Sequence, residues 1–336
     1  MLGAAKVRKT PLAAILAILA CLVANCALGA QPALVLDTTV PLPRVSGRID
    51  HMAFDPTRGH IAIAEIGNDS ADIVNLETRS VMHRIGKLVE PQGIAYVTST
   101  DSLVIANGGD GSLRLYRGAD FSEIGRIDLG GDVDNVHGIE GTDRVLVGYG
   151  SGALALVDTR TRKLVSRTPL AGHPEGFRLA PDEVHAYVNV PNAHEIAVVD
   201  IATGKQTGTW RFPGLRGNFP MAIDRNGDSI AVVFRSPPRL GLVDTSSGKL
   251  RSSYTTCGDA DDVFFNESSS RIYVSCGAGE VDVFGRDGAG YRKLQSFKTS
   301  SGARTALYVP DLDRLFVAAR AGRLFGSAKL FVLRPE

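Results

Sequence analysis

Short apolar segments recur along the chain, separated by turns rich in Gly, Asn and Asp. In the first copy, apolar residues dominate segments 49–54, 60–64 and 73–76, and the turn at 55–59 reads Asp-Pro-Thr-Arg-Gly. A more polar segment then leads to the next copy. Segments of about five or six residues, rich in β-branched side chains and bounded by turn residues, are typical of β-strands. The pattern therefore predicts four short strands in each copy.

The copies repeat at a period slightly above 40 residues. When the first strands are aligned, the equivalent positions are Asp50, Gln92, Asn135, Glu175, Phe219, Asp261 and Arg304, with spacings of 42, 43, 40, 44, 42 and 43. Four short strands in each repeat of this length are typical of one propeller blade. The 53 Gly and Pro residues are too many for an array of paired helices. We predict an all-β fold, a seven-bladed β-propeller.

The two ends of the repeat array are complementary. The seventh copy supplies only three strands, at residues 307–309, 314–318 and 329–333, whereas an additional apolar segment, residues 33–43, precedes the first copy. We expect this N-terminal segment to be the fourth strand of the last blade. Such closure of the ring covers sheet edges that would otherwise be open to aggregation.

The first thirty residues have the order of features of a secretory signal peptide. A cationic stretch at 6–9 precedes an apolar run at 12–23, and small residues follow as far as Ala30. The run is about a dozen residues long, shorter than the roughly 20 that span a membrane. We expect cleavage after Gly29 or Ala30, which would leave residues 31–336 as a single propeller domain in the periplasm or outside the cell.

A second interpretation of this segment is a lipoprotein signal at residues 18–21, with Cys21 lipidated and anchored to a membrane. No later segment has a longer apolar run, so no transmembrane segment is expected in the mature chain. Loss of the signal changes the formal net charge from +1 to −2. Because the Lys and Arg residues are scattered among acids rather than gathered in a basic stripe, no nucleic-acid partner is expected.

Two cysteines remain in the mature chain. Cys257 lies in the loop entering the sixth copy, and Cys276 ends the second strand of that copy. Antiparallel pairing places the start of a strand beside the end of its neighbour, which suits the Cα separation of about 4.4 to 6.8 Å that a disulfide needs. We predict a structural disulfide between them, as exported proteins often contain.

The copies also share a residue pattern. Residues 93–97 read Gly-Ile-Ala-Tyr-Val, followed by a second strand and Gly-rich turn at 103–113, and segments 271–275 and 314–318 repeat the theme. In this pattern the chain resembles the YVTN-repeat propellers of exported bacterial proteins, over residues 33–336. The resemblance implies the fold and a binding function, and it implies no catalytic residues.

The strand starts are expected to meet at one mouth of the propeller. The ligand-binding residues expected there are Asp50, His51, Gln92, Asn135, His173, Glu175, Asp261, Asp262 and Arg304. Carboxylates, an amide and imidazoles that converge on an axis suit a divalent cation such as Ca²⁺. Glu175, Asn135 and Asp261 are therefore candidate metal ligands. The alternative is that these acids accept hydrogen bonds from neighbouring loops around a wet channel.

The leading hypothesis is an exported, monomeric, non-enzymatic propeller that binds a small molecule, a peptide or an envelope protein at this mouth. The alternative is a metal-dependent hydrolase of the lactonase type, with a metal-bound water as nucleophile. A redox cofactor is not expected, because the sequence contains no Cys-x-x-Cys-His motif and only one Trp. The Gly-rich segment 148–152 precedes a strand pattern rather than a helix, which predicts a hairpin turn and not a phosphate loop.

Overall fold

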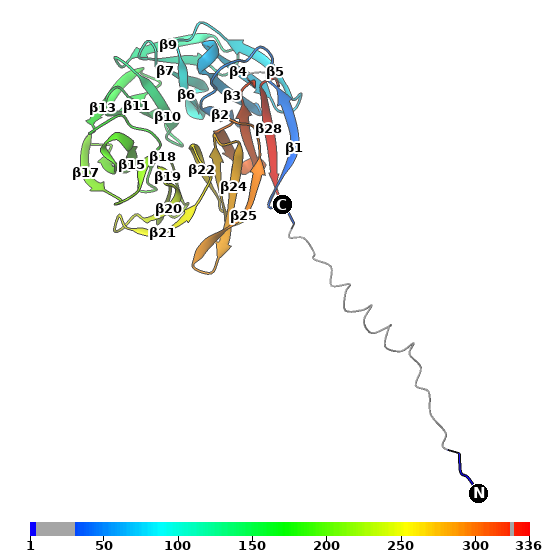
Figure 1. Cartoon of the computed structure of the whole chain (residues 1–336). Helices are drawn as coiled ribbons and strands as arrows, with labels where there is room; N and C mark the ends of the chain where they lie inside the picture. The colour runs from blue at the N-terminus through cyan, green and yellow to red at the C-terminus, as the bar shows by residue number, and fades with distance from the viewer. Residues whose placement is uncertain (5–30, 323–325) are drawn as a thin grey trace. The chain divides into compact units, whose positions relative to one another are not determined.

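Seven antiparallel sheets of four strands each are arranged around a central axis (Figure 1). The structure is a computed structural model that describes residues 1–4, 31–322 and 326–336. Residues 33–335 form the unit that contains all seven sheets. The predicted all-β, seven-bladed propeller is therefore confirmed. The predicted signal peptide falls mostly on residues 5–30, which lie outside the described residues, so it stays a prediction.

Each blade is an up-and-down meander. Blades one to four contain β2 (Met52–Asp55), β3 (His60–Glu65), β4 (Ser70–Asn75) and β5 (Ser80–Ile85); β6 (Pro91–Val97), β7 (Ser102–Asn107), β8 (Ser112–Arg117) and β9 (Glu123–Asp128); β10 (Val133–Gly138), β11 (Arg144–Tyr149), β12 (Ala153–Asp158) and β13 (Lys163–Pro169); and β14 (Phe177–Leu179), β15 (His185–Val190), β16 (Glu195–Asp200) and β17 (Lys205–Trp210). Blades five to seven contain β18 (Arg216–Ile223), β19 (Ser229–Ser236), β20 (Pro238–Asp244) and β21 (Leu250–Thr255); β22 (Ala260–Asn266), β23 (Arg271–Cys276), β24 (Glu280–Asp287) and β25 (Gly290–Lys298); and β26 (Thr305–Val309), β27 (Arg314–Ala319), β28 (Lys329–Pro335) and β1 (Leu34–Pro41).

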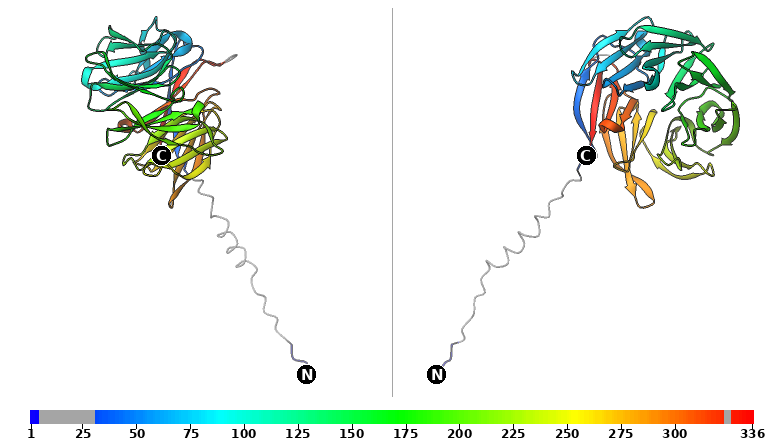
Figure 2. Two further views of the ribbon diagram at one scale, coloured as in Figure 1. Left: turned by 90° about the vertical axis from the view of Figure 1, so that its left-hand side faces the viewer. Right: turned by 180° about the vertical axis from the view of Figure 1, so that it is seen from behind.

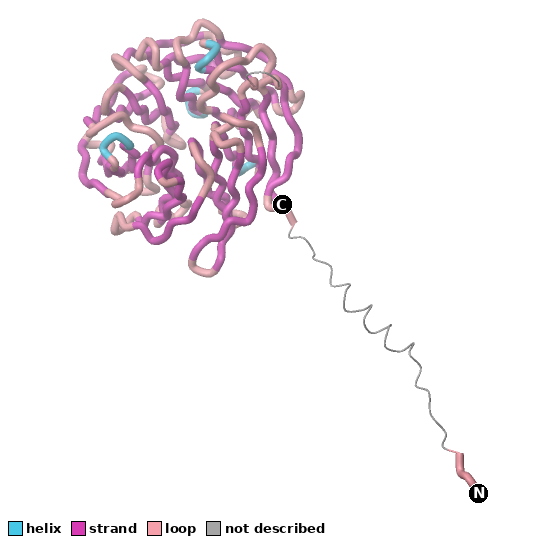
Figure 3. The backbone as a smooth tube through the Cα atoms, in the orientation of Figure 1, coloured by secondary structure: helices cyan, strands magenta, loops and turns pink. Residues whose placement is uncertain are grey.

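Short 3₁₀ turns join some of these strands (Figure 3). They are η1 (Ile66–Asn68), η2 (Thr98–Thr100), η3 (Pro191–Ala193) and η4 (Pro310–Leu312). No helix of the described residues is long and apolar enough to cross a membrane.

The middle strands of a blade are buried on both faces, which explains their nearly continuous apolar sequences. In the first blade, all six residues of β3 are buried, whereas Ile85 is the only buried residue of the outermost strand β5. Apolar side chains from neighbouring blades pack together in seven clusters that fill the spaces between the sheets. Burial between blades therefore holds the ring together, and the outer strand stays polar.

The N-terminal strand β1 pairs with the C-terminal strand β28 and closes the ring, as predicted (Figures 1 and 2). In every blade the outermost pair contains a register shift, and β1 has its own between Leu36 and Thr38. Leu34 and Val40 are fully buried. The side chain of Gln295, from the sixth blade, hydrogen-bonds to both the N–H and the carbonyl of Leu34, at 2.8 and 2.9 Å. β1 therefore packs as a regular fourth strand.

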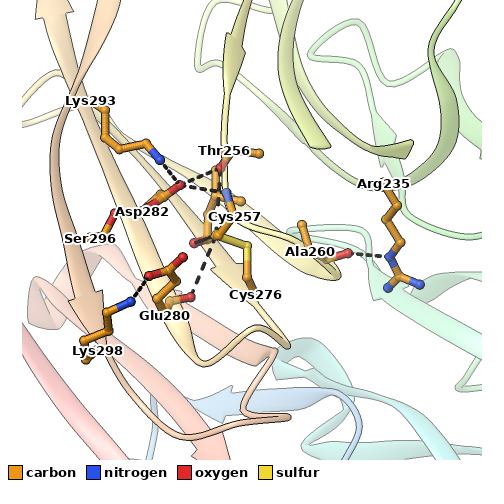
Figure 4. The surroundings of a disulfide bond; sticks show 11 residues. Arg235, Thr256, Cys257, Ala260, Cys276, Glu280, Asp282, Lys293, Ser296 and Lys298 are labelled. Carbon is orange, nitrogen blue, oxygen red and sulfur yellow. Dashed lines mark hydrogen bonds and ion pairs between the residues drawn. A yellow bond between two sulfur atoms is a disulfide. The ribbon is translucent and has the colours of Figure 1, made fainter. Parts of the chain in front are cut away.

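The predicted disulfide joins Cys257, which precedes β22, to Cys276 at the end of β23 (Figure 4). The two Cα atoms lie 5.9 Å apart, and both residues are buried. Asp282 supports the loop from the next strand, because its carboxylate accepts hydrogen bonds from the Cys257 N–H at 2.8 Å and from the Thr256 hydroxyl at 3.0 Å. The covalent link thus fixes the entry to the sixth blade.

Candidate functional site

The innermost strands of the seven blades start at one mouth of the axial channel and end at the other. The strand ladders make seven positions equivalent: Met52, Ile94, Val136, Phe177, Met221, Val263 and Ala306. The residues two positions earlier form a ring at the first mouth: Asp50, Gln92, Asp134, Glu175, Phe219, Asp261 and Arg304. The sequence alignment was therefore wrong by one residue in the third blade, where Asp134 takes the place given to Asn135. Two adjacent polar residues and a register shift in β10 hide the true equivalence.

We call this opening the acidic mouth, defined by Asp50, Asp134, Glu175 and Asp261 with the side chains that contact them. It leads into a cavity of about 50 Å³ that is lined by five carboxylates and two guanidinium groups. A buried water needs roughly 10 to 15 Å³ of such space, and drug-sized ligands occupy pockets of about 300 Å³ or more. The cavity therefore suits a few waters, an ion or one slender polar group.

Arginines neutralise one side of the acidic mouth. Asp261 accepts a hydrogen bond from Arg235 at 2.5 Å, and its other oxygen lies 2.9 Å from Nε of Arg304. Arg304 also donates to Asp259 at 3.2 Å. The Arg235 guanidinium lies 3.6 Å from the centre of the Phe219 ring, a cation–π contact. Asp261 and Arg304 are therefore in contact at the mouth, and Asp261 is held between two guanidinium groups.

On the opposite side, His173 pairs with Asp134. The His173 Nδ1 lies 2.6 Å from the carbonyl of Gly150, so this nitrogen donates its proton there, and Nε2 lies 3.4 Å from the Asp134 carboxylate. Burial alone would lower the pKa of His173, but the contacts with Asp134 and with the carbonyl raise it to about 9. The imidazole is therefore a cation at neutral pH. The carbonyl belongs to the turn between β11 and β12, the hairpin turn that the sequence predicts.

Glu175 is the carboxylate of this mouth without a direct partner. It lines the cavity, and among the described residues none donates a hydrogen bond to its side chain or pairs with it within 4.0 Å. Burial, followed by repulsion from Asp134, raises the pKa of Glu175 to about 7. Glu175 is therefore a carboxyl group at the cavity whose charge no direct ion pair of the described residues neutralises.

Asp50, His51 and Asp262 also line the cavity. Asp50 is buried and accepts a hydrogen bond from Arg48 at 2.9 Å, and burial raises its pKa to about 6. Asp262 accepts the backbone N–H of Ala306 at 2.7 Å, and burial raises its pKa to about 7. Burial opposes protonation of His51, but the surrounding carboxylates outweigh it and raise its pKa. Asp50 belongs to the ring, and His51 and Asp262 each follow a ring residue in the sequence.

Two further predicted mouth residues, Asn135 and Gln92, differ in whether they contact the cavity. Asn135 is buried and lines the cavity, whereas Gln92 does not line it, and its amide lies 3.5 Å from Asp132. The described residues hold one group of three available oxygen and nitrogen ligands within 4.8 Å of one another at this mouth: Asp134, His173 and Glu175. Glu175 thus belongs to this group, and Asp261 does not. Asn135 as a metal ligand stays a prediction.

A hydrogen-bonded pair from the third and fourth blades lines the channel behind the acidic mouth. Nη1 of Arg178 donates to Nε2 of His137 at 2.8 Å, so this nitrogen carries no proton. Burial, with the neighbouring Arg178 charge, lowers the pKa of His137 well below its usual value, and the imidazole is neutral. We call the pair the septum. At the same position of the repeat, blades one, two and five have Ala53, Ala95 and Ala222, whose small side chains leave room for it.

Comparisons with known proteins support the architecture. No family model matches the chain, and neither does any curated protein. Solved structures do match. A chain of hydrazine synthase from Kuenenia stuttgartiensis superposes with a TM-score of 0.74 at 16% identity, covering 84% of this chain and 95% of that one. A chain of the mitotic checkpoint complex superposes with a TM-score of 0.77 at 11% identity, covering 99% and 96%. At these identities the likeness shows the fold alone.

Proposed function

We propose that the protein is an exported binding propeller of the YVTN-repeat type whose acidic mouth receives one cationic group of its ligand. Five carboxylates line the cavity, and among the described residues Glu175 alone of the four that define the mouth has no cation within ion-pairing distance. The small volume of the cavity suits a single slender ammonium, such as a lysine side chain, with the rest of a peptide or partner protein lying on the surrounding loops.

The observation that carries the proposal is the state of Glu175. Its carboxyl group lines the cavity and has no ion-pair partner within 4.0 Å among the described residues, and its pKa is raised to about 7 because burial and the Asp134 charge outweigh the attraction of His173 and Arg235. A bound ammonium would be a direct partner for this group, and a charge-assisted hydrogen bond to a carboxylate is about twice as strong as a neutral one.

Calorimetry with a capped Gly-Gly-Lys-Gly-Gly peptide at pH 8 tests the proposal. We expect the lysine peptide to bind more tightly than the same peptide with norleucine, and Glu175→Gln to weaken it by about tenfold or more, the loss of one charge-assisted hydrogen bond. The matched control is Glu77→Gln, which removes one carboxylate from an exposed turn. Equal binding of the two peptides, or equal losses in the two variants, would overturn the proposal.

A second candidate function is metal-dependent hydrolysis, favoured by the Asp134, His173 and Glu175 group. The proton on Nδ1 of His173 is directed to the Gly150 carbonyl, the arrangement that orients the other nitrogen of metal-binding histidines. Two carboxylates and an imidazole suit Zn²⁺ or Mn²⁺ better than Ca²⁺. A metal held there would lower the pKa of a bound water that attacks a lactone.

His173→Gln separates the two functions. The variant removes a nitrogen ligand, so stoichiometric binding of Zn²⁺ in equilibrium dialysis and hydrolysis of a chromogenic lactone would both be lost. It also removes a positive charge beside Asp134, so the lysine peptide should bind at least as well as before. Zn²⁺ binding that disappears in this variant would favour the hydrolase, and absence of both Zn²⁺ and Mn²⁺ binding by the wild type would exclude it.

Export is supported by the disulfide, because such bonds persist in oxidising compartments. Fractionation of cells that express the full chain, with mass spectrometry of the mature N-terminus, tests this part. An N-terminus at residue 30 or 31 in the periplasm or medium is expected. A lipidated N-terminus at Cys21 would instead indicate a membrane anchor, and an uncleaved cytoplasmic chain would contradict export.

A further inference from the structure

The opposite mouth of the propeller is wide and lined by aromatic side chains. Two adjoining cavities of about 710 and 680 Å³ open there, and both are lined by Glu140, Tyr308, Pro310 and Asp311. We call them together the aromatic mouth. Their partly exposed aromatic side chains are Phe54, Tyr96, Phe264 and Phe265. Cavities of roughly 300 to 1,000 Å³ with apolar walls and a few fixed polar groups hold small-molecule ligands in other proteins.

The septum forms the floor of the aromatic mouth. Arg178 lines both the cavity of the acidic mouth and one cavity of the aromatic mouth, and His137 lines the first and the other of the two. The pair thus lies between the acidic mouth and the aromatic mouth. A ligand that enters from the aromatic side meets the Arg178 guanidinium at the end of its path.

Arg178 has hydrogen-bond donors at this floor that no described residue accepts. Both of its hydrogen bonds come from Nη1, one to His137 and one to the carbonyl of Phe177 at 2.7 Å. Among the described residues, no acceptor is bound to its Nε or Nη2, and no carboxylate lies within 4.0 Å of the guanidinium. Burial lowers the pKa of Arg178 to about 10, so it remains charged at neutral pH. A charge enclosed without an anionic partner favours the binding of an anion.

We propose that the aromatic mouth binds a monocarboxylate with a flat apolar body, its carboxylate paired with Arg178 and its body packed on the aromatic walls. A guanidinium matches a carboxylate through two parallel hydrogen bonds. One guanidinium and a neutral imidazole provide a single positive charge, which suits a monoanion and not a phosphate. Glu140 and Asp311 lie exposed on the wall that the two cavities share, where dissolved salt screens their charges. Their repulsion is therefore weaker for a single carboxylate at the floor than for a multivalent anion.

Calorimetry with 2-naphthoate and its uncharged amide, 2-naphthamide, tests this site at pH 7.5. In the wild type the acid should bind about tenfold or more tightly than the amide, because only the acid forms the charge-assisted pair. Arg178→Met should remove that preference. The control is Arg225→Gln, which removes a cation from the lining of the same mouth and should change binding by less than about twofold.

Equal binding of acid and amide to the wild type overturns the proposal, and so does absence of binding by the acid. It is also overturned if the preference for the acid is lost in Arg225→Gln and kept in Arg178→Met. The acid–amide comparison needs no variant, so it decides the question even if Arg178→Met fails to fold. The two sites can be tested separately, although Arg178 lines a cavity of each. The lysine peptide should still bind to folded Arg178→Met, and failure of one site leaves the other testable.

Discussion

A buried glutamate in the first blade should make the stability of the protein depend on pH. Glu65 is fully buried, its Oε2 accepts the Ser70 hydroxyl at 2.6 Å, and its Oε1 has no hydrogen-bond partner. Arg84 donates two hydrogen bonds to Asp72, at 2.6 and 2.7 Å, and its guanidinium lies 3.9 Å from the Glu65 carboxylate. Burial, followed by the Asp72 charge, therefore raises the pKa of Glu65 from 4.5 to about 8.

The direction of the pH dependence follows from the numbers of protons that the folded and unfolded chains bind. Between pH 4.5 and 8 the folded chain holds a proton on Glu65 that the unfolded chain has lost, so stability is fully present below the unfolded pKa and falls as pH rises through this window. At about 1.4 kcal/mol per pH unit, the loss is on the order of 4 kcal/mol. Glu65→Gln keeps the shape and the Ser70 contact without the titration, so its stability relative to the wild type should rise by that order from pH 5 to 8.

Urea unfolding, followed by far-UV circular dichroism at pH 5, 6, 7 and 8, measures the difference between Glu65→Gln and the wild type. The comparison cancels the titrations of the acidic mouth, which are common to both proteins. Glu77→Gln, on an exposed turn of the same blade, should give a difference that does not change with pH. A Glu65→Gln difference that is equally constant would refute the reasoning.

Two further predictions concern the closure of the ring and the disulfide. Leu34→Ala, at a fully buried position of β1, should cost about 2 to 5 kcal/mol in urea unfolding, whereas Leu36→Ala, 48% exposed on the same strand, should cost less than about 0.5; equal costs would mean that β1 is not packed as described. Cys257→Ser/Cys276→Ser opens a crosslink between residues 19 apart and should cost about 3 kcal/mol. Dithiothreitol should lower the melting temperature of the wild type and leave that of the double variant unchanged; equal sensitivity would contradict the bond.

The fold could be predicted because its signals are local. Each blade carries its own turns and apolar strands, so the repeat count gives the architecture, and counting strands at both ends identifies β1 as the closing strand. The disulfide follows from the same strand order, since Cys257 lies in the loop before one strand and Cys276 ends the strand that pairs with it.

The site was predicted less completely because its contacts join different blades. Asp134 and Asn135 are adjacent polar residues, and only the pairing of β10 with β11 distinguishes them. Arg235 lies at the end of β19, two residues longer than the second strand of most blades, and its reach to Asp261 depends on how far that hairpin extends. The septum has a recognisable pattern in the sequence. Once the blades are aligned, His137 and Arg178 occupy a position where three of the other five blades have Ala.

The central claim is that ionised Glu175 receives a cationic group at the acidic mouth, and the affinity of the lysine peptide between pH 5.5 and 8 tests it most directly. The pKa of Glu175 and that of Asp262 are both raised to about 7, so these carboxylates lose their protons within this range. The account predicts an affinity that rises with pH and levels off near pH 8, with a much smaller rise in Glu175→Gln. An affinity independent of pH, or the same rise in Glu175→Gln, would contradict it.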